Sequence, residues 1–286
     1  MLRSRNMRFS SRIFKSAFPG LLLPGLLWVV LFPASAWAQF GAELHDKTTR
    51  EFEKYESSSE AKMSWTPRYG TLAPGEVRIE PASGDGNTDI DDGIVHDWVA
   101  AAIVRDATVQ QVIDLLQDYD EYPEMYTPEV QEARVISHRG NDWRVFLQMY
   151  KQKVLSATLN GEFDVQYRDR GRGRWTMVSR STRIAEVDDG KELPVGKGHG
   201  FLWRLNAYWL VEPRPEGVYL EVRSMSLSRD VPFGLGMVIK PFITSVPRES
   251  LNDTMTNTVK ELERRVALAR RAPVEVASSK HPAVAE

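Results

Sequence analysis

The side chains that most often carry catalysis or bind metals are few in this sequence. Cysteine is absent from the 286 residues, which excludes disulfides, thiol nucleophiles, iron–sulfur clusters and cysteine-ligated zinc. The histidines lack the His-x-His or His-Glu-x-x-His spacing of a zinc site, and no Gly-x-Ser-x-Gly motif of a serine hydrolase occurs. The sequence therefore predicts no resident metal, no cofactor and no catalytic centre; its histidines are His45, His96, His138, His199 and His281.

Two glycine-containing segments match ligand-binding loops only in part. Residues 85–89 (DGNTD) begin like a calcium loop, but Ile90 stands at the required glycine and His96 at the closing glutamate. Residues 196–200 (GKGHG) lack the Gly-Lys-Ser/Thr ending of a phosphate-binding loop. We expect an acidic linker at the first segment and a solvated turn at the second.

Large apolar side chains supply the stronger pattern. On a strand over residues 200–212, alternate side chains share one face, and that face carries Phe201, Trp203, Leu205 and Trp209. Two tryptophans six residues apart on one face suit a flat or long hydrophobic ligand. The alternative is that these side chains simply fill a core.

A long helix near the C-terminus presents a second apolar stripe. Phe242, Val246 and Met255 lie on it at roughly helical spacing. Met237 belongs, with Phe233 and Leu235, to an apolar lip around two glycines at the start of this helix; the alternative is a buried, tightly packed helix start. Arg183 shares strand parity with Trp175, which makes an inward position possible. We expect Arg183 either to contact a ligand or to form a structural ion pair.

The N-terminus carries a sharp charge asymmetry. The chain has 37 basic and 39 acidic residues; the first 38 hold five bases and no acid, which leaves 37 − 5 = 32 bases against 39 acids. That acidic balance excludes a generally basic nucleic-acid binder. The bases Arg3 to Lys15 precede a 12-residue apolar run (21–32) and Ala36-Trp37-Ala38, the pattern of a cleaved signal peptide. An uncleaved anchor is the alternative, although the run is short for a membrane span.

The rest of the chain divides into segregated strands and helices. That order predicts an α+β fold with an antiparallel sheet. We expect a signal peptide at 1–38, a helix and irregular linker at 39–92, the main domain at 93–272 and a disordered tail at 273–286. We expect helices over residues 42–63, 108–117, 120–126 and 235–271, and strands over 94–105, 130–138, 143–153, 157–167, 174–187, 200–212 and 218–229.

Two long segments resemble a known superfamily. Residues 107–130 (ATVQQVIDLLQDYDEYPEMYTPEV) and 226–266 (SLSRDVPFGLGMVIKPFITSVPRESLNDTMTNTVKELERRV) are similar to the helix pair and the terminal helix of START-like domains. This superfamily is also called SRPBCC, and its polyketide cyclase/dehydrase and coenzyme Q-binding branch is the most similar. Over residues 93–270 the resemblance implies a helix-grip fold, a curved antiparallel sheet wrapped round a long C-terminal helix with an apolar cavity between them. Members bind lipids, sterols and quinones, and a minority are enzymes.

The resemblance and the leader together favour an exported, non-enzymatic protein, periplasmic or secreted. Its expected partner is a hydrophobic small molecule such as a lipid, an acyl chain or an isoprenoid quinone, with transient membrane contact through the apolar lip and no nucleic acid. One alternative is a cyclase, dehydratase or hydrolase, which would need an inward acid–base pair. Another is an interaction protein that docks through residues 43–63.

Overall fold

Long strands, several of which alternate apolar and polar side chains, form the main sheet of the domain. The computed structural model describes residues 41–73, 75–152, 156–230 and 236–271, with only the backbone for 236–242. The elements are β1 (Ala42–Glu43), α2 (Asp46–Ala61), β2 (Arg78–Pro81), β3 (Asn87–Ile90), β4 (Gly93–Arg105), α3 (Val109–Gln117), η1 (Tyr119–Glu121), α4 (Tyr122–Met125), β5 (Val130–Arg139), β6 (Asp142–Gln152), β7 (Ser156–Asp169), β8 (Trp175–Asp188), β9 (Lys191–Glu192), β10 (Lys197–Gly198), β11 (Arg204–Arg214), β12 (Gly217–Arg229) and α5 (Gly236–Arg271).

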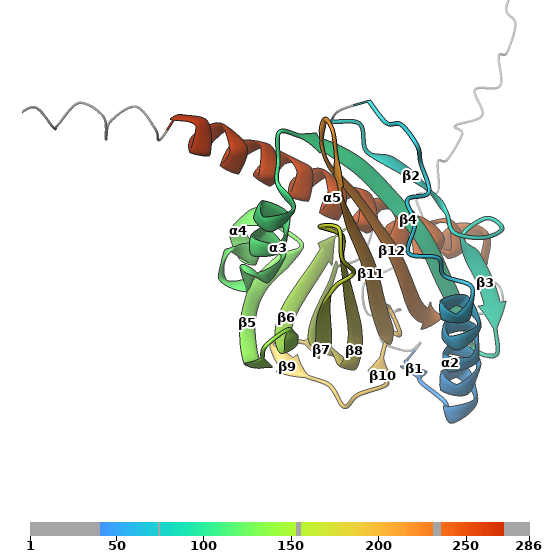
Figure 1. Cartoon of the computed structure of the whole chain (residues 1–286). Helices are drawn as coiled ribbons and strands as arrows, with labels where there is room; N and C mark the ends of the chain where they lie inside the picture. The colour runs from blue at the N-terminus through green and yellow to red at the C-terminus, as the bar shows by residue number, and fades with distance from the viewer. Residues whose placement is uncertain (1–40, 74, 153–155, 231–235, 272–286) are drawn as a thin grey trace, which may run out of the picture.

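One antiparallel sheet organises these elements. In the described part of the chain it has ten strands in the order β2-β4-β12-β11-β8-β7-β6-β5, with β3 paired to β4 and β9 to β8. Figure 1 shows the sheet curving in front of α5, with α3 and α4 beside β5. The fold is therefore the predicted α+β helix-grip, in which an antiparallel sheet packs on a long C-terminal helix.

The contact between α5 and β4 holds the helix on the sheet. α5 buries Leu251, Met255, Val259 and Leu262 at spacings of three and four residues, which place them on one helical face. The small, fully buried side chains of Ala100 and Ala102 lie in the same core as that face, so the helix can approach the strand closely. Each buried large apolar side chain stabilises the fold by about 1.5–3 kcal/mol. Among the described residues, no helix is long and apolar enough to cross a membrane.

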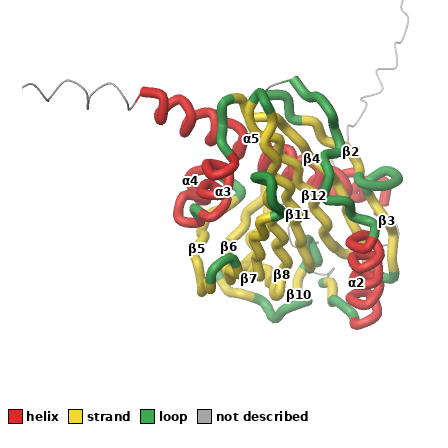
Figure 2. The backbone as a smooth tube through the Cα atoms, viewed as in Figure 1, coloured by secondary structure: helices red, strands yellow, loops and turns green. Residues whose placement is uncertain are grey.

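The helix predicted near the N-terminus packs on the outer, convex face of the sheet. Phe52 of α2 is 1% exposed and packs with Val95, Trp203 and Leu227. Because Leu227 alternates with the cavity-facing Ser226 and Ser228 on β12, α2 lies on the face opposite to α5. Figure 2 shows α2 beside the β3 edge of the sheet.

A polar network fixes the second half of α2 to the same face. Arg180 of β8 forms ion pairs with Glu56 and Glu60. Asn206 donates to Glu56 at 2.8 Å, and the Tyr208 hydroxyl donates to Glu60 at 2.6 Å. One side of α2 is therefore already packed against the sheet. This gives less support to the alternative that residues 43–63 dock on a partner.

A buried histidine links the neighbouring strands β3, β4 and β12. His96 of β4 is 1% exposed; its Nδ1 lies 2.7 Å from Asn87 Oδ1 of β3, and its Nε2 lies 2.9 Å from Ser228 Oγ of β12. Burial disfavours the imidazolium form and lowers the pKa of His96 to about 4. The ring is therefore neutral near pH 7.

Gly217, the first residue of β12 after the turn from β11, cannot carry a side chain. Its φ is +151°, and a Cβ there would overlap the carbonyl oxygen of Val104 and lie 2.9 Å from Arg105 Cα. We expect Gly217→Ala to lower the free energy of unfolding by about 3 kcal/mol, measured by urea denaturation. Gly70→Ala, where a Cβ meets nothing within 4 Å, is the control and should change stability by less than about 0.5 kcal/mol. Equal stabilities of the two variants would contradict this account of the turn.

The buried neutral His96 also predicts a pH dependence. Its pKa is about 4 when folded and about 6.5 when unfolded, so the unfolded chain binds more protons between these values and stability falls as the pH drops. Unfolding free energies at pH 7 and pH 4 should show that His96→Gln removes roughly 3 kcal/mol of the decline. His138→Gln, at an exposed histidine, should keep the full decline; equal behaviour of both variants would show that His96 is not responsible.

Candidate functional site

A cavity of about 450 Å³ lies between the concave face of the sheet and α5. Strands β6, β7, β8, β11 and β12 form its walls, and α5 and the segment before β5 close its sides. Most of its lining is apolar, including Val145, Leu147, Met149, Leu159, Phe163, Val165, Met177, Leu205, Trp209, Val222 and Leu251. A concave, mainly apolar site with a few polar groups is typical of small-molecule binding.

Tyrosine rings close the end of the cavity near α3 and α4. Tyr119, Tyr122 and Tyr126 line it, but their hydroxyls bond to the protein. Tyr122 donates to the Leu116 carbonyl at 2.8 Å, Tyr126 and Thr258 hydroxyls lie 2.9 Å apart, and Tyr119 bonds to another tyrosine hydroxyl at 3.0 Å. Burial raises the pKa of all three, to about 12 for Tyr126, so they stay neutral and contribute aromatic surface.

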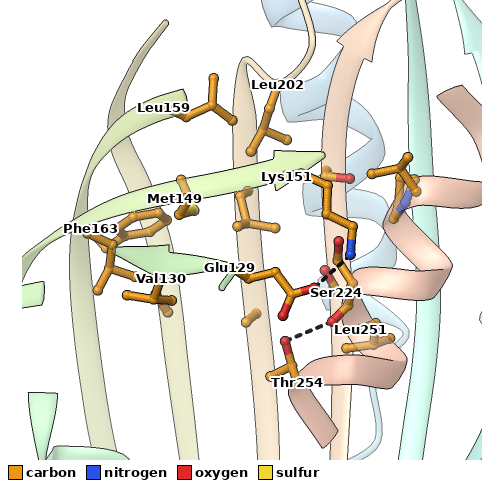
Figure 3. Close-up of a pocket in the computed structure, with 18 of the residues that line it drawn as sticks. Glu129, Val130, Met149, Lys151, Leu159, Phe163, Leu202, Ser224, Leu251 and Thr254 are labelled. Carbon is orange, nitrogen blue, oxygen red and sulfur yellow. Dashed lines mark hydrogen bonds and ion pairs between the residues drawn. The ribbon is translucent and has the colours of Figure 1, made fainter. Parts of the chain in front are cut away.

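An ion cluster lies on the cavity wall beside α5. Lys151 Nζ of β6 is 2.7 Å from Glu129 Oε1 and 3.1 Å from Asp253 Oδ2 of α5, and Figure 3 shows Lys151 and Glu129 directed toward each other. Burial raises the pKa of Glu129, and the hydrogen bond from Lys151 offsets this rise only in part. For Lys151, burial lowers the pKa, but the hydrogen bonds to Glu129 and Asp253 outweigh burial, so its pKa is raised. The cluster therefore keeps its amine charged and ties α5 to the sheet.

The turn that precedes β11 is held by a buried carboxylate. Glu186 of β8 is 6% exposed and accepts hydrogen bonds from the backbone N–H groups of His199 at 2.7 Å and Phe201 at 3.0 Å. His199 Nδ1 lies 3.1 Å from the same carboxylate, and the His199 ring stacks on Phe201. The sequence predicted a solvated turn here; the structure places His199 in the cavity lining, 33% exposed at its side chain.

The structure brings four of the nine predicted cavity residues into the lining. Phe201, Leu205, Trp209 and Val246 line it. Met255 instead packs in the core further along α5. The side chains of Met237 and Phe242 lie outside the described residues.

Trp203 and Arg183 lie away from the cavity, each for a physical reason. The regular strand begins only at Arg204, so strand alternation does not extend to Trp203, which packs beneath α2. In β8 the register with β7 shifts near Ser181 and Arg183, and such a bulge reverses the face of the following side chain. Arg183 accordingly pairs with Glu192 of β9, as the ion-pair interpretation expected.

The cavity also contains polar residues that the sequence analysis did not select. Lys151 and Glu129 were missed because they meet only through the pairing of distant segments. The serines of β12 carried a usable signal, since Ser224, Ser226 and Ser228 alternate in the sequence and all line the cavity. In the described ranges, no group of three or more His, Asp or Glu side chains could hold a metal ion.

Several solved structures resemble this chain. A STAR-related lipid transfer protein from Xanthomonas axonopodis is 17% identical, with a TM-score of 0.40 over 64% of this chain and 99% of that one. The Zhui aromatase/cyclase from Streptomyces is 14% identical, with a TM-score of 0.45 over 61% and 98%. Human STARD10 is 11% identical, with a TM-score of 0.43 over 67% and 78%.

Sequence comparison identifies the family. No curated protein matches the chain significantly. The family described as "Polyketide cyclase / dehydrase and lipid transport" matches residues 106–253, from the turn before α3 to the ion cluster on α5. Because this match covers more than half of the 286 residues, the chain belongs to the polyketide cyclase/dehydrase and lipid transport family, a START-like (SRPBCC) family.

Proposed function

We propose that the mature protein is an exported, non-enzymatic carrier that binds a hydrophobic small molecule between its sheet and α5. The observation that carries this proposal is the mainly apolar cavity of about 450 Å³. Its volume falls within the range of about 300–1,000 Å³ typical of small-molecule sites. A lipid, an acyl chain or an isoprenoid quinone supplies the apolar surface that such a lining buries.

The titratable groups of the cavity support binding more than catalysis. Lys151 is engaged by two carboxylates, and His199 faces Glu186 at the rim. His96 is hydrogen-bonded at both ring nitrogens. A general acid or base must reach a bound substrate with a proton to exchange, and these groups are directed at protein partners. The cyclase, dehydratase or hydrolase alternative therefore has less support.

Export is the second part of the proposal, and it rests on the leader sequence. Residues 1–38 and the apolar lip around residues 231–235 lie outside the described residues. The basic start, the short apolar run and Ala36-Trp37-Ala38 support cleavage after Ala38. We place the mature protein in the periplasm or the extracellular space, where a carrier would shield an apolar ligand from water, with transient contact to a membrane through the lip.

Filling the cavity should abolish ligand binding. Ala207 lines the cavity from the middle of β11, so the ring introduced by Ala207→Phe would occupy space that a ligand needs. We expect this variant to raise the dissociation constant of N-phenyl-1-naphthylamine at least tenfold, a loss of about 1.4 kcal/mol or more, measured by fluorescence titration of the mature protein.

The matched control is Val135→Phe, at an exposed position of β5, which should leave dye binding unchanged. Thermal unfolding followed by circular dichroism establishes that both variants fold. A folded Ala207→Phe variant that binds the dye as tightly as the unsubstituted protein would refute binding between the sheet and α5.

Processing of the leader is tested separately. When the full chain is expressed in a Gram-negative host, the periplasmic fraction should contain a protein whose first residue is Gln39, read by intact-mass spectrometry. Ala36→Arg combined with Ala38→Arg should block cleavage, because the processing site requires small side chains. Full-length protein retained in the cytoplasm from the unsubstituted gene would contradict export.

A further inference from the structure

Three serine hydroxyls are directed into the cavity from adjacent parts of the sheet. Ser224 and Ser226 lie on β12 and Ser179 on β8, and all three line the cavity. Ser226 is only 3% exposed, so its hydroxyl is almost completely removed from bulk solvent. These serines interrupt a wall that is otherwise largely apolar.

The strand register places the serines around a small residue. Ala207 of β11 is opposite Ser179 on one side and Ser224 on the other. Because neighbouring strands lie about 4.8 Å apart, the two serines are separated by roughly 10 Å with only a methyl group between them. Ser226 is two residues further along β12, opposite Leu205 and next to His96. The four residues Ser179, Ala207, Ser224 and Ser226 form a feature that we call the serine notch.

The hydroxyls of the serine notch have no partner among the described residues. Nearby serines differ in this respect: Ser181 Oγ accepts from the Leu205 N–H at 2.9 Å, and Ser228 Oγ lies 2.9 Å from His96 Nε2. A bound molecule that covers a polar group without hydrogen-bonding to it leaves that group unpaired, at a cost of about 1–3 kcal/mol. A bound molecule that hydrogen-bonds to the notch would avoid this cost.

The surroundings of the serine notch define what such a molecule must offer. A serine hydroxyl both donates and accepts a hydrogen bond and carries no charge. The nearest amine on the wall, Lys151, is already paired with two carboxylates. Two residues along each strand, Met177, Trp209 and Val222 form an apolar row across β8, β11 and β12, and this row lines the same cavity. A molecule with an uncharged oxygen at the notch and a hydrocarbon part along the apolar row matches both the serine hydroxyls and the apolar side chains.

We propose that the cavity selects a neutral amphiphile whose hydroxyl or carbonyl groups hydrogen-bond to serines of the notch and whose hydrocarbon part lies against Met177, Trp209 and Val222. This inference rests on the proposed function, since it names the class of ligand for the same cavity. It assigns selectivity to the serine notch and affinity to the apolar row.

The test compares three naphthalenes of similar size in competition with N-phenyl-1-naphthylamine at pH 7. They are 2-naphthol, with a neutral hydroxyl, 2-methylnaphthalene, with a methyl group in its place, and 2-naphthoate, with a charge. In the triple variant Ser179→Ala, Ser224→Ala and Ser226→Ala, the preference for 2-naphthol over 2-methylnaphthalene should fall about tenfold, because hydrogen bonds to the notch are lost. Binding of 2-methylnaphthalene should be unchanged, and the control Thr182→Ala, at an exposed residue, should retain the full preference.

The outcomes separate this inference from the function on which it rests. If the unsubstituted protein binds the dye but the triple variant keeps the same preference, the serine notch is overturned while the carrier function stands. Tighter binding of 2-naphthoate than of 2-naphthol would overturn the neutral character of the ligand. Failure of the unsubstituted protein to bind the dye or any naphthalene would refute the carrier function and the inference together.

Discussion

The contact between α5 and β4 is the constraint on which the cavity depends. The apolar stripe of α5 is buried in one core with the small side chains of β4, so one edge of the curved sheet holds the helix closely. The other strands curve away from that edge, and large apolar side chains fill the space only in part, leaving about 450 Å³. Lys151 and Asp253 add a second connection, between β6 and α5. The same packing that stabilises the domain thus also creates its binding site.

Those parts of the fold that depend on patterns within one sequence segment could be predicted. The spacing of apolar residues in α5 and the Thr108 capping box of α3 lie within single segments, and the helices formed where they were expected. Where an irregularity depended on a neighbouring strand, prediction failed. Trp203 precedes the regular part of β11, and Arg183 follows a bulge that only the pairing with β7 reveals. One residue out of register is enough to reverse a side chain's face.

The candidate site could be predicted less well, because most of its polar character arises from pairing between distant segments. Glu129, Lys151 and Asp253 come from a loop, a strand and a helix that are distant in the sequence, and no local pattern joins them. The serine notch depends on Ala207 lying opposite both Ser179 and Ser224. Apolar lining residues such as Leu205 and Trp209 were easier to predict, since alternation along a single strand selects them. Sequence therefore indicated a hydrophobic cavity, whereas the grouping of its polar side chains emerges from the register of the sheet.

The central claim is that this cavity holds a hydrophobic small molecule. The most direct test is organic extraction of the mature protein, purified without detergent from the periplasm of a Gram-negative host, followed by mass spectrometry of the extract. We expect a neutral amphiphile at close to one equivalent per chain, absent from an extract of the folded Ala207→Phe variant. An unsubstituted protein that yields no bound small molecule, and takes up none when incubated with a total lipid extract, would contradict the claim.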